Sequence, residues 1–181
     1  GQGLLIVGES GCGKSSLLRA IAGLWNSGTG VIIRPPLEQI LFLPQRPYMI
    51  LGTLRNQVLY PHSDSNLEDR KLYQVLDLVN LSDLPKRFGG LDIEADWADV
   101  LSLGEQQRLA FARVLLTNPP YAILDEATSA LDLKNEANLY RHLQKTRTTF
   151  VSVGHRPSLN EYHHLMLRLS EGGKWQFNQM V

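Results

Sequence analysis

Short apolar runs alternate with longer segments of helical period along most of the chain. A short apolar or β-branched run bounded by polar or turn-forming residues predicts a strand. Such runs occur at residues 4–7, 31–33, 40–43, 121–124, 148–153, 165–169 and 175–177. We expect the last two runs to complete an edge of the sheet.

Helical periodicity occupies much of the chain between these runs. Its apolar spacing predicts helices at residues 16–24, 54–60, 67–79, 104–116 and 133–146. Thr53 is placed to cap the second of these helices. Residues 81–98 carry Pro85, Gly89 and Gly90, which predicts an irregular segment.

The order of these elements predicts an α/β fold built around a parallel sheet. A helical subdomain is expected as an insertion at about residues 47–117, where helical segments follow one another without an intervening strand. The chain has 181 residues and is 43% hydrophobic, which suits one domain over residues 1–181 with a substantial core.

Composition makes some classes of function less favoured, direct nucleic-acid binding among them. Lys and Arg together number 18 and Asp and Glu together number 18, so no global positive field favours direct nucleic-acid binding. Cys12 is the only cysteine of the sequence, which therefore forms no internal disulfide. No apolar run approaches the ~18 residues of a membrane-spanning helix. Contact with a membrane would need a partner or a further segment.

Residues 8–15 read G-E-S-G-C-G-K-S and match the phosphate-binding pattern G-x-x-x-x-G-K-[ST]. The predicted strand before them and the helix after them would aim backbone N–H groups and the positive helix end at one anion. Lys14 would reach the β- and γ-phosphates of a bound triphosphate, and the Ser15 hydroxyl would bind Mg²⁺. The predicted nucleotide-binding residues of this loop are Gly8, Gly11, Gly13, Lys14, Ser15 and Ser16.

Two adjacent carboxylates follow the apolar run 121–124. Side chains alternate along a strand, so Asp125 and Glu126 are expected to point to different places. Asp125 would hold Mg²⁺ through water, and Glu126 would polarise or deprotonate the attacking water. Alone, such a pair would also fit a solvated strand end.

Residues 101–108 read L-S-L-G-E-Q-Q-R and begin a predicted helix. Ser102 as the cap and Glu105 three residues later fit a capping box, so this stretch alone could be only a good helix start. Ser102, Gly104 and the free backbone N–H groups of the first turn would also suit a second anion site.

These motifs together resemble the nucleotide-binding domain of ATP-binding cassette (ABC) transporters. The resemblance covers almost the whole chain and includes six motifs in the family's order: Walker A at 8–15, the Q-loop at Gln45, the signature at 101–107, Walker B at 121–126, the D-loop at 129–132 and the switch histidine at His155. Residues 97–108 and 152–156 are similar to subfamily D half-transporters and their bacterial relatives. Those relatives carry fatty acyl, cobalamin or peptide substrates, so the subfamily does not fix a substrate.

The resemblance implies that two such domains close head to tail around two ATP molecules. Ser102 and Gly104 would contact the γ-phosphate held by the partner domain, and the isolated monomer should hydrolyse ATP poorly. Gln45 would add a ligand to Mg²⁺ or its water, and His155 would hydrogen-bond the γ-phosphate. The other four histidines are interpreted as surface or packing residues.

Further partners follow from the same resemblance. A transmembrane domain, expected in the same full-length chain, would dock its coupling helix near residues 46–53, although core packing would equally explain the apolar residues there. The domain would then lie on the cytoplasmic face of a membrane. The sequence enters directly on the strand before Walker A, so the family's N-terminal strands are missing and the chain is expected to be a fragment.

One departure from the commonest signature concerns its third and fifth positions. The family's usual residues there are glycine and glutamine, whereas this chain has Leu103 and Glu105. Related subfamily D patterns tolerate changes at these positions, and we expect activity to be kept.

Alternative functions remain open at this point. A soluble ABC-type ATPase could act in a non-transport role, for example on chromosomes, but Gln45 and Ser102 are separated by only 102 − 45 = 57 positions without heptads. A catalytically silent module would be favoured if Lys14, Glu126 or His155 were replaced, and none is. A small-molecule P-loop kinase would not need the signature or the switch histidine.

Overall fold

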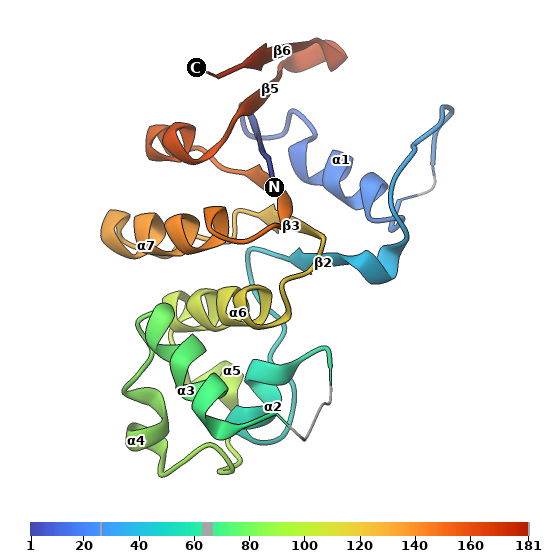
Figure 1. The fold of residues 1–181 in the computed structure, drawn as a ribbon. Helices are drawn as coiled ribbons and strands as arrows, with labels where there is room; N and C mark the ends of the chain where they lie inside the picture. The colour runs from blue at the N-terminus through green and yellow to red at the C-terminus, as the bar shows by residue number, and fades with distance from the viewer. Residues whose placement is uncertain (26, 63–66, 181) are drawn as a thin grey trace.

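The computed structural model describes residues 1–25, 27–62 and 67–180. A six-stranded sheet in the order β2-β3-β4-β1-β5-β6 runs through it (Figure 1). The strands are β1 (Gly3–Gly8), β2 (Ile40–Leu43), β3 (Tyr121–Asp125), β4 (Thr149–Val153), β5 (Leu165–Leu169) and β6 (Trp175–Gln179). All neighbouring strands pair in parallel except β5 and β6, which are antiparallel. The predicted α/β fold with a parallel sheet is confirmed.

The helices lie on both faces of this sheet and in a separate group beside it (Figure 1). They are α1 (Lys14–Ile21), α2 (Leu54–Leu59), α3 (Asp69–Leu78), α4 (Leu84–Phe88), α5 (Trp97–Val100), α6 (Leu103–Thr117) and α7 (Leu133–Gln144). Short 3₁₀ turns are found at η1 (Leu37–Gln39), η2 (Pro157–Tyr162) and η3 (Glu171–Gly173).

Alternation along the strands divides the core into two layers. Leu5 of β1 belongs to the larger cluster, which includes residues of α6 and α7, whereas the next residue, Ile6, packs with Leu18 of α1. The sheet is thus buried on both faces, as parallel sheets usually are.

The helices α2 to α5 lie together with α6, beyond the sheet edge formed by β2 (Figure 1). Trp97 is fully buried among them and donates from Nε1 to the carbonyl of Gly52 at 2.8 Å. Phe88 packs edge-on against the Trp97 ring at 5.1 Å between centroids. The long helix α6 contacts α2, α3, α7 and β2, so it links the helical group to the sheet.

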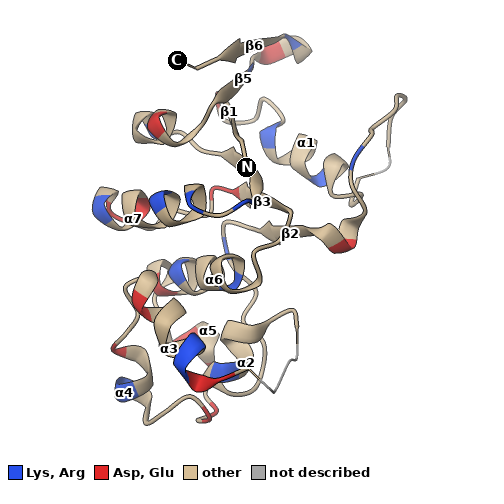
Figure 2. Cartoon of the chain, viewed as in Figure 1, with Lys and Arg blue, Asp and Glu red and all other residues tan. Residues whose placement is uncertain are grey.

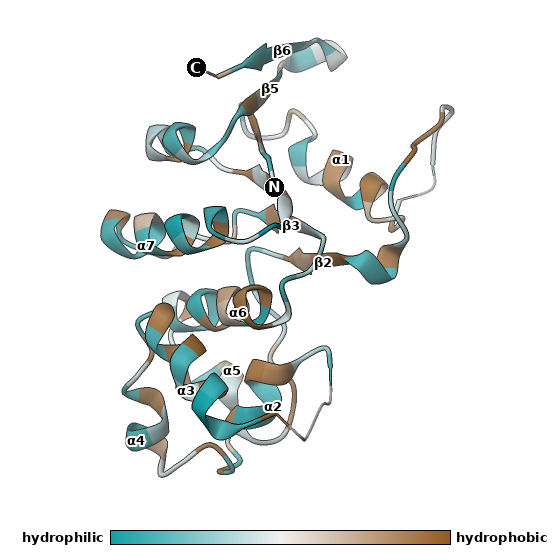
Figure 3. Ribbon diagram, in the orientation of Figure 1, coloured by the Kyte–Doolittle hydropathy of each residue, from teal (hydrophilic) through white to brown (hydrophobic). Residues whose placement is uncertain are grey.

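One predicted strand is wrong. Residues 31–33 form no regular element, and Val31 and Ile33 are 88% and 95% exposed. They lie on the segment between α1 and β2 that extends away from the sheet, where Figure 3 shows a strongly apolar stretch. A three-residue apolar run becomes a strand only beside a partner strand, and none of the described residues provides one.

The expected irregular segment 81–98 is wrong in part, because it contains α4 and the start of α5. Asp83 begins α4 with Pro85 at the second helical position, where its missing N–H costs nothing, and Gly89 ends the helix with φ 90°. The other predicted helices are present with shifted ends. Helix α1 begins at Lys14 and ends at Ile21, and Thr53 and Ser102 cap α2 and α6.

Charge is distributed evenly over this fold. Figure 2 shows acidic and basic residues interspersed along the helices. In the described ranges, we find no helix with the length and apolar character needed to cross a membrane.

Candidate functional site

The predicted site residues come from the carboxyl ends of neighbouring parallel strands. The phosphate loop follows β1, Gln45 follows β2, Asp125 ends β3 and His155 follows β4. The strands β2, β3, β4 and β1 are adjacent and parallel, so these groups lie together at the carboxyl ends of the strands. Ligands of open α/β sheets bind at the carboxyl ends of the strands.

The phosphate loop turns sharply between β1 and α1. Gly8 has φ 155°, and a Cβ atom there would lie 2.4 Å from the carbonyl oxygen of Leu169. Gly13 has φ 98° and forms the left-handed N-cap of α1. The glycines therefore let the loop pass close to β5 and direct the first N–H groups of α1 outward.

Lys14 closes over this loop. Its side chain is 6% exposed, and Nζ donates to the carbonyls of Gly8 at 2.9 Å and Glu9 at 2.7 Å. A cavity of about 210 Å³ lies beside it, lined by Ser10, Gly11, Gly13, Lys14, Ser15, Ser16, Glu126 and His155. The cavity walls are thus backbone, hydroxyl, ammonium, carboxylate and imidazole groups, which suits a phosphate chain.

Ser15 and Asp125 meet beside the loop. The Ser15 hydroxyl donates to Oδ1 of Asp125 at 3.1 Å. Burial raises the pKa of the Asp125 carboxyl above its ordinary value, against the opposing hydrogen bond from Ser15. A half-buried carboxylate beside a hydroxyl oxygen is a donor set that fits Mg²⁺, which takes one or two protein oxygens and completes its shell with phosphates and water. Among the described residues, no three His, Cys, Asp or Glu side chains are grouped so that they could hold a metal ion.

Glu126 contacts two of the other predicted site residues, Gln45 and His155. Its Oε2 accepts from Nε2 of Gln45 at 2.9 Å, and its Oε1 lies 3.2 Å from Nε2 of His155. The residue has φ 49°, a left-handed conformation that is uncommon for a side-chain-bearing residue. Glu126 thus contacts Gln45 and His155, whereas Asp125 contacts Ser15.

The described geometry keeps the signature residues apart from this cavity. Ser102 caps α6 and closes a capping box with Glu105, and neither Ser102 nor Gly104 lines the cavity at the phosphate loop. A Cβ atom on Gly104 would lie 3.2 Å from the Ala130 carbonyl oxygen, so the start of α6 packs closely on the turn after β3.

Gln107 is a site residue to which the sequence assigned no role. It is completely buried; its Nε2 donates to the Gln45 carbonyl at 2.8 Å and to Oγ of Ser129 at 3.1 Å, and its Oε1 accepts from the Ala130 N–H at 3.0 Å. We call this set the Gln107 junction. It joins the segments after β2 and β3 to α6, and only burial, which sequence does not show, distinguishes it from a surface glutamine.

Arg156 makes a second connection that the sequence did not reveal. Its guanidinium donates to the carbonyls of Leu131 at 2.7 Å and Ser129 at 3.1 Å, and to the buried Glu136 at 3.3 Å. The segment that carries His155 is therefore tied to residues 129–131. The position of Arg156 directly after His155 was the only available signal.

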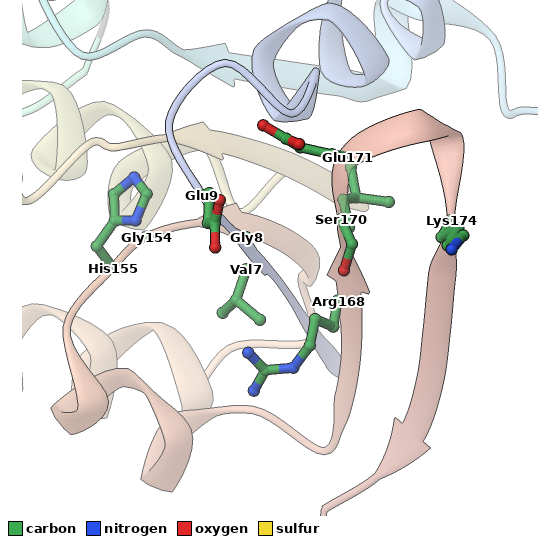
Figure 4. Close-up of a pocket in the computed structure, with 10 residues that line it drawn as sticks. Val7, Gly8, Glu9, Gly154, His155, Arg168, Ser170, Glu171 and Lys174 are labelled. Carbon is green, nitrogen blue, oxygen red and sulfur yellow. The ribbon is translucent and has the colours of Figure 1, made fainter.

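A larger hollow of about 650 Å³ opens on the other side of residues 8–9 (Figure 4). Figure 4 shows His155 and Glu9 at one side, with Arg168 below and Ser170, Glu171 and Lys174 on the hairpin of β5 and β6. His155 also lines the cavity at the phosphate loop. The imidazole thus lies between the two spaces.

The comparison with known proteins decides the family. The family model described as "ABC transporter" matches residues 1–129, which is more than half of the chain. The chain belongs to the ABC transporter family.

Its relatives include proteins of sub-family D. An uncharacterized ABC transporter ATP-binding protein of Synechocystis is 61% identical over 98% of this chain. The human lysosomal cobalamin transporter ABCD4 is 48% identical over 97% of it, and human ATP-binding cassette sub-family D member 3 is 42% identical over 100%. The chain spans 27%, 31% and 28% of these three relatives, so it corresponds to their ATP-binding domain and not to their whole length.

The fold of this ABC transporter domain matches a solved structure. A bacterial Atm1-family ABC exporter with ATP bound aligns with a TM-score of 0.81 at 25% identity, over 99% of this chain and 34% of the exporter chain. The resemblance predicted from the six motifs is confirmed, and the chain is an ATP-binding domain with a mixed α/β fold.

Proposed function

We propose that this ABC transporter domain binds ATP with Mg²⁺ and hydrolyses ATP in a site completed by a second copy, and that the hydrolysis powers movement of a substrate across a membrane. The observation that carries the proposal is the convergence of Gln45 and His155 on Glu126, beside the phosphate loop. Simple nucleotide storage would need the loop but not this arrangement.

ATP would bind along the phosphate loop. The N–H groups at the start of α1 and the Lys14 ammonium would hold the phosphate oxygens, for which Lys14 would exchange its carbonyl partners on Gly8 and Glu9. Ser15, Asp125 and Gln45 would hold Mg²⁺, which would neutralise negative charge on the phosphates during the reaction.

Glu126 is assigned the role of general base. It would accept a proton from the water that attacks the γ-phosphorus, so that ADP leaves and inorganic phosphate forms. The Gln45 amide on Oε2 fixes the carboxylate, while His155 would hydrogen-bond the γ-phosphate and orient the same water. The roles divide between the two adjacent carboxylates: Asp125 binds the metal and Glu126 handles the proton.

The start of α6 suits the nucleotide of a partner domain. Ser102 and the N–H of Gly104 lie at the positive end of a fifteen-residue helix, and they do not line the cavity of their own phosphate loop. Two copies facing each other would bring each helix start to the other's γ-phosphate. The partner would be a second nucleotide-binding domain, in a homodimer or a heterodimer.

A membrane domain is proposed as the further partner, in the same full-length chain, which would hold this domain at the cytoplasmic face. Its docking surface would be the segment 46–53, where Tyr48 and Leu51 are 64% and 89% exposed. Arg113 of α6 is buried and donates to the carbonyls of Tyr48 at 2.9 Å and Gln57 at 2.7 Å. The surface is therefore tied to the helix that begins at the signature, and we assign residues 47–117 to one helical subdomain.

The proposal is tested by Glu126→Gln in the intact protein that carries this chain. Loss of the carboxylate should slow steady-state hydrolysis about a hundredfold or more, the usual contribution of a positioned base, while ATP binding persists. Stable ATP-dependent pairing, measured by light scattering, should accumulate. Equal hydrolysis by Glu126→Gln and the unsubstituted protein would refute the assignment of the base.

Lys14→Ala serves as the matched comparison. It removes the phosphate contact and should abolish nucleotide binding, measured with a fluorescent ATP analogue, so no pairing should follow. A protein that hydrolyses ATP at full rate while held as a monomer would refute the shared site.

A further inference from the structure

The fifth position of the signature is Glu105, whose negative charge would repel a phosphate group. Glu105 lies at the third position of α6, within the first turn that we assign to the partner's γ-phosphate. A carboxylate there stabilises the helix itself, because it interacts favourably with the positive helix end. It also cancels the positive potential that would attract a polyphosphate.

The Glu105 carboxylate divides its two oxygens between neighbours. Oε2 accepts from the backbone N–H of Ser102 at 2.8 Å and from the Ser102 hydroxyl at 2.9 Å, and Oε1 forms an ion pair with Nη2 of Arg87 at 2.7 Å. Burial opposes ionisation of Glu105, but the bonds from Ser102 and Arg87 together lower its pKa below the ordinary value. Glu105 is therefore a carboxylate at neutral pH.

Arg87 is held in position from the other side. It belongs to α4, and its guanidinium lies 4.9 Å from the centroid of the neighbouring Phe88 ring, which packs on buried Trp97. Its contact with Asp83 is longer, at 3.5 Å. The nearby Arg108 is directed at the carbonyls of Gly104 and Asn80 instead of at Glu105.

We infer that Arg87 is a positioning residue of the nucleotide site: it neutralises Glu105 and fixes its Oε1, so that Ser102 and the start of α6 can receive the terminal phosphate of ATP held by a second copy. The inference rests on the proposed function. It assigns to α4 a part in the signature that no motif of the chain indicates.

The inference predicts a change in ATP-dependent closure without a change in the chemical step. In the intact protein, Arg87→Met should raise the apparent KM for ATP by about fivefold, the size of one partly exposed charge pair. Because Glu126, Gln45 and His155 are untouched, kcat at saturating ATP should stay within about twofold. The difference in KM should shrink at high salt, where exposed charges are screened.

A double variant distinguishes neutralisation of Glu105 from a purely structural role, in which the ion pair only holds α4 against α6. Glu105→Gln removes the charge but keeps a side chain that can close the same capping box. The double variant Arg87→Met/Glu105→Gln should have the KM of Glu105→Gln alone. Tethering would instead leave the double variant as weak as Arg87→Met, and this result would overturn the inference.

Two control variants test whether the effect is specific to the charge of Arg87 and its pairing with Glu105. Asp83→Asn removes the other carboxylate near Arg87 and should leave KM unchanged, and Arg87→Lys keeps the positive charge and should stay near the unsubstituted protein. An Arg87→Met protein with normal KM and normal thermal unfolding would refute the inference while leaving the proposed function intact. An unsubstituted protein without ATP hydrolysis would refute both.

Discussion

Gln107 uses both polar atoms of its amide to connect three segments of the site. A leucine there would keep the volume of the side chain but leave the Ala130 N–H and the Gln45 carbonyl without these bonds. An unsatisfied buried polar group costs about 1–3 kcal/mol, so the segments around Glu126 should lose their fixed arrangement. The junction is therefore a candidate link between the helix that begins at the signature and the proposed general base, Glu126.

We accordingly predict that Gln107→Leu lowers kcat for ATP hydrolysis by about tenfold or more, because a small displacement of the Gln45 segment disturbs Glu126. Nucleotide binding should persist, since the phosphate loop is unaffected. Steady-state kinetics and thermal unfolding measured together check the prediction. Gln144→Leu on α7, which removes one bond to the Tyr162 carbonyl, is the matched control and should keep kcat. Equal loss in both variants would contradict a specific role.

At the scale of elements, the contact of His163 with η2 and β4 should make the stability of the fold depend on pH. His163 follows η2 and is buried; its ring nitrogens contact the Leu159 carbonyl at 2.7 Å and Oγ of Ser152 in β4 at 2.8 Å. Burial lowers the pKa of His163 from 6.5 to about 4. Folding thus favours the neutral ring. The stabilisation that the neutral His163 ring gives to the folded state is complete above pH 6.5 and is lost as the pH falls towards 4.

The free energy of unfolding should therefore decrease by about 3 kcal/mol through this one group between neutral pH and pH 4. Urea unfolding at a series of pH values checks this, and His163→Gln should flatten the dependence over that range. His62→Gln, at an exposed histidine, should leave the slope unchanged. A slope identical in all three proteins would show that His163 does not control acid stability.

Elements with strong local signals could be predicted from sequence, and those that depend on distant partners could not. The strand before the phosphate loop and the cap at Ser102 follow from nearby residues alone. Residues 31–33 have the same apolar character, but their state depends on a strand that must lie beside them. The short helix α4 was missed because Pro85 and Gly89 read as breakers, whereas here they begin and end a helix.

The candidate site shows the same division. Parallel strand ends predict that residues 8–15 and 125–126 meet, whereas the bond between Gln45 and Glu126 joins positions 81 residues apart. Gln107 lies within the signature 101–107, but its buried contacts could not be predicted, and Arg87 looked like an ordinary surface arginine in a segment expected to be irregular. Their importance arises only from packing.

At the scale of the whole molecule, the exposed segment 46–53 should transmit closure to the membrane partner. We predict that Leu51→Glu in the full-length protein abolishes substrate transport in membrane vesicles, since a charge would be buried on docking. Tyr73→Glu, at another exposed apolar residue on α3, is the control and should transport normally. Normal transport by Leu51→Glu would place the docking surface elsewhere.

The cavity at the phosphate loop has one further consequence. Its lining consists of three serines, two glycines, one lysine, one carboxylate and one imidazole, which lie on the phosphate loop, at the start of α1 and after β3 and β4. Those groups suit phosphate oxygens and their charge, and the lining contains no Phe, Tyr or Trp side chain on which a purine ring could stack. This cavity would therefore bind guanosine and adenosine triphosphates equally well, and residues outside it must provide selectivity for the nucleobase.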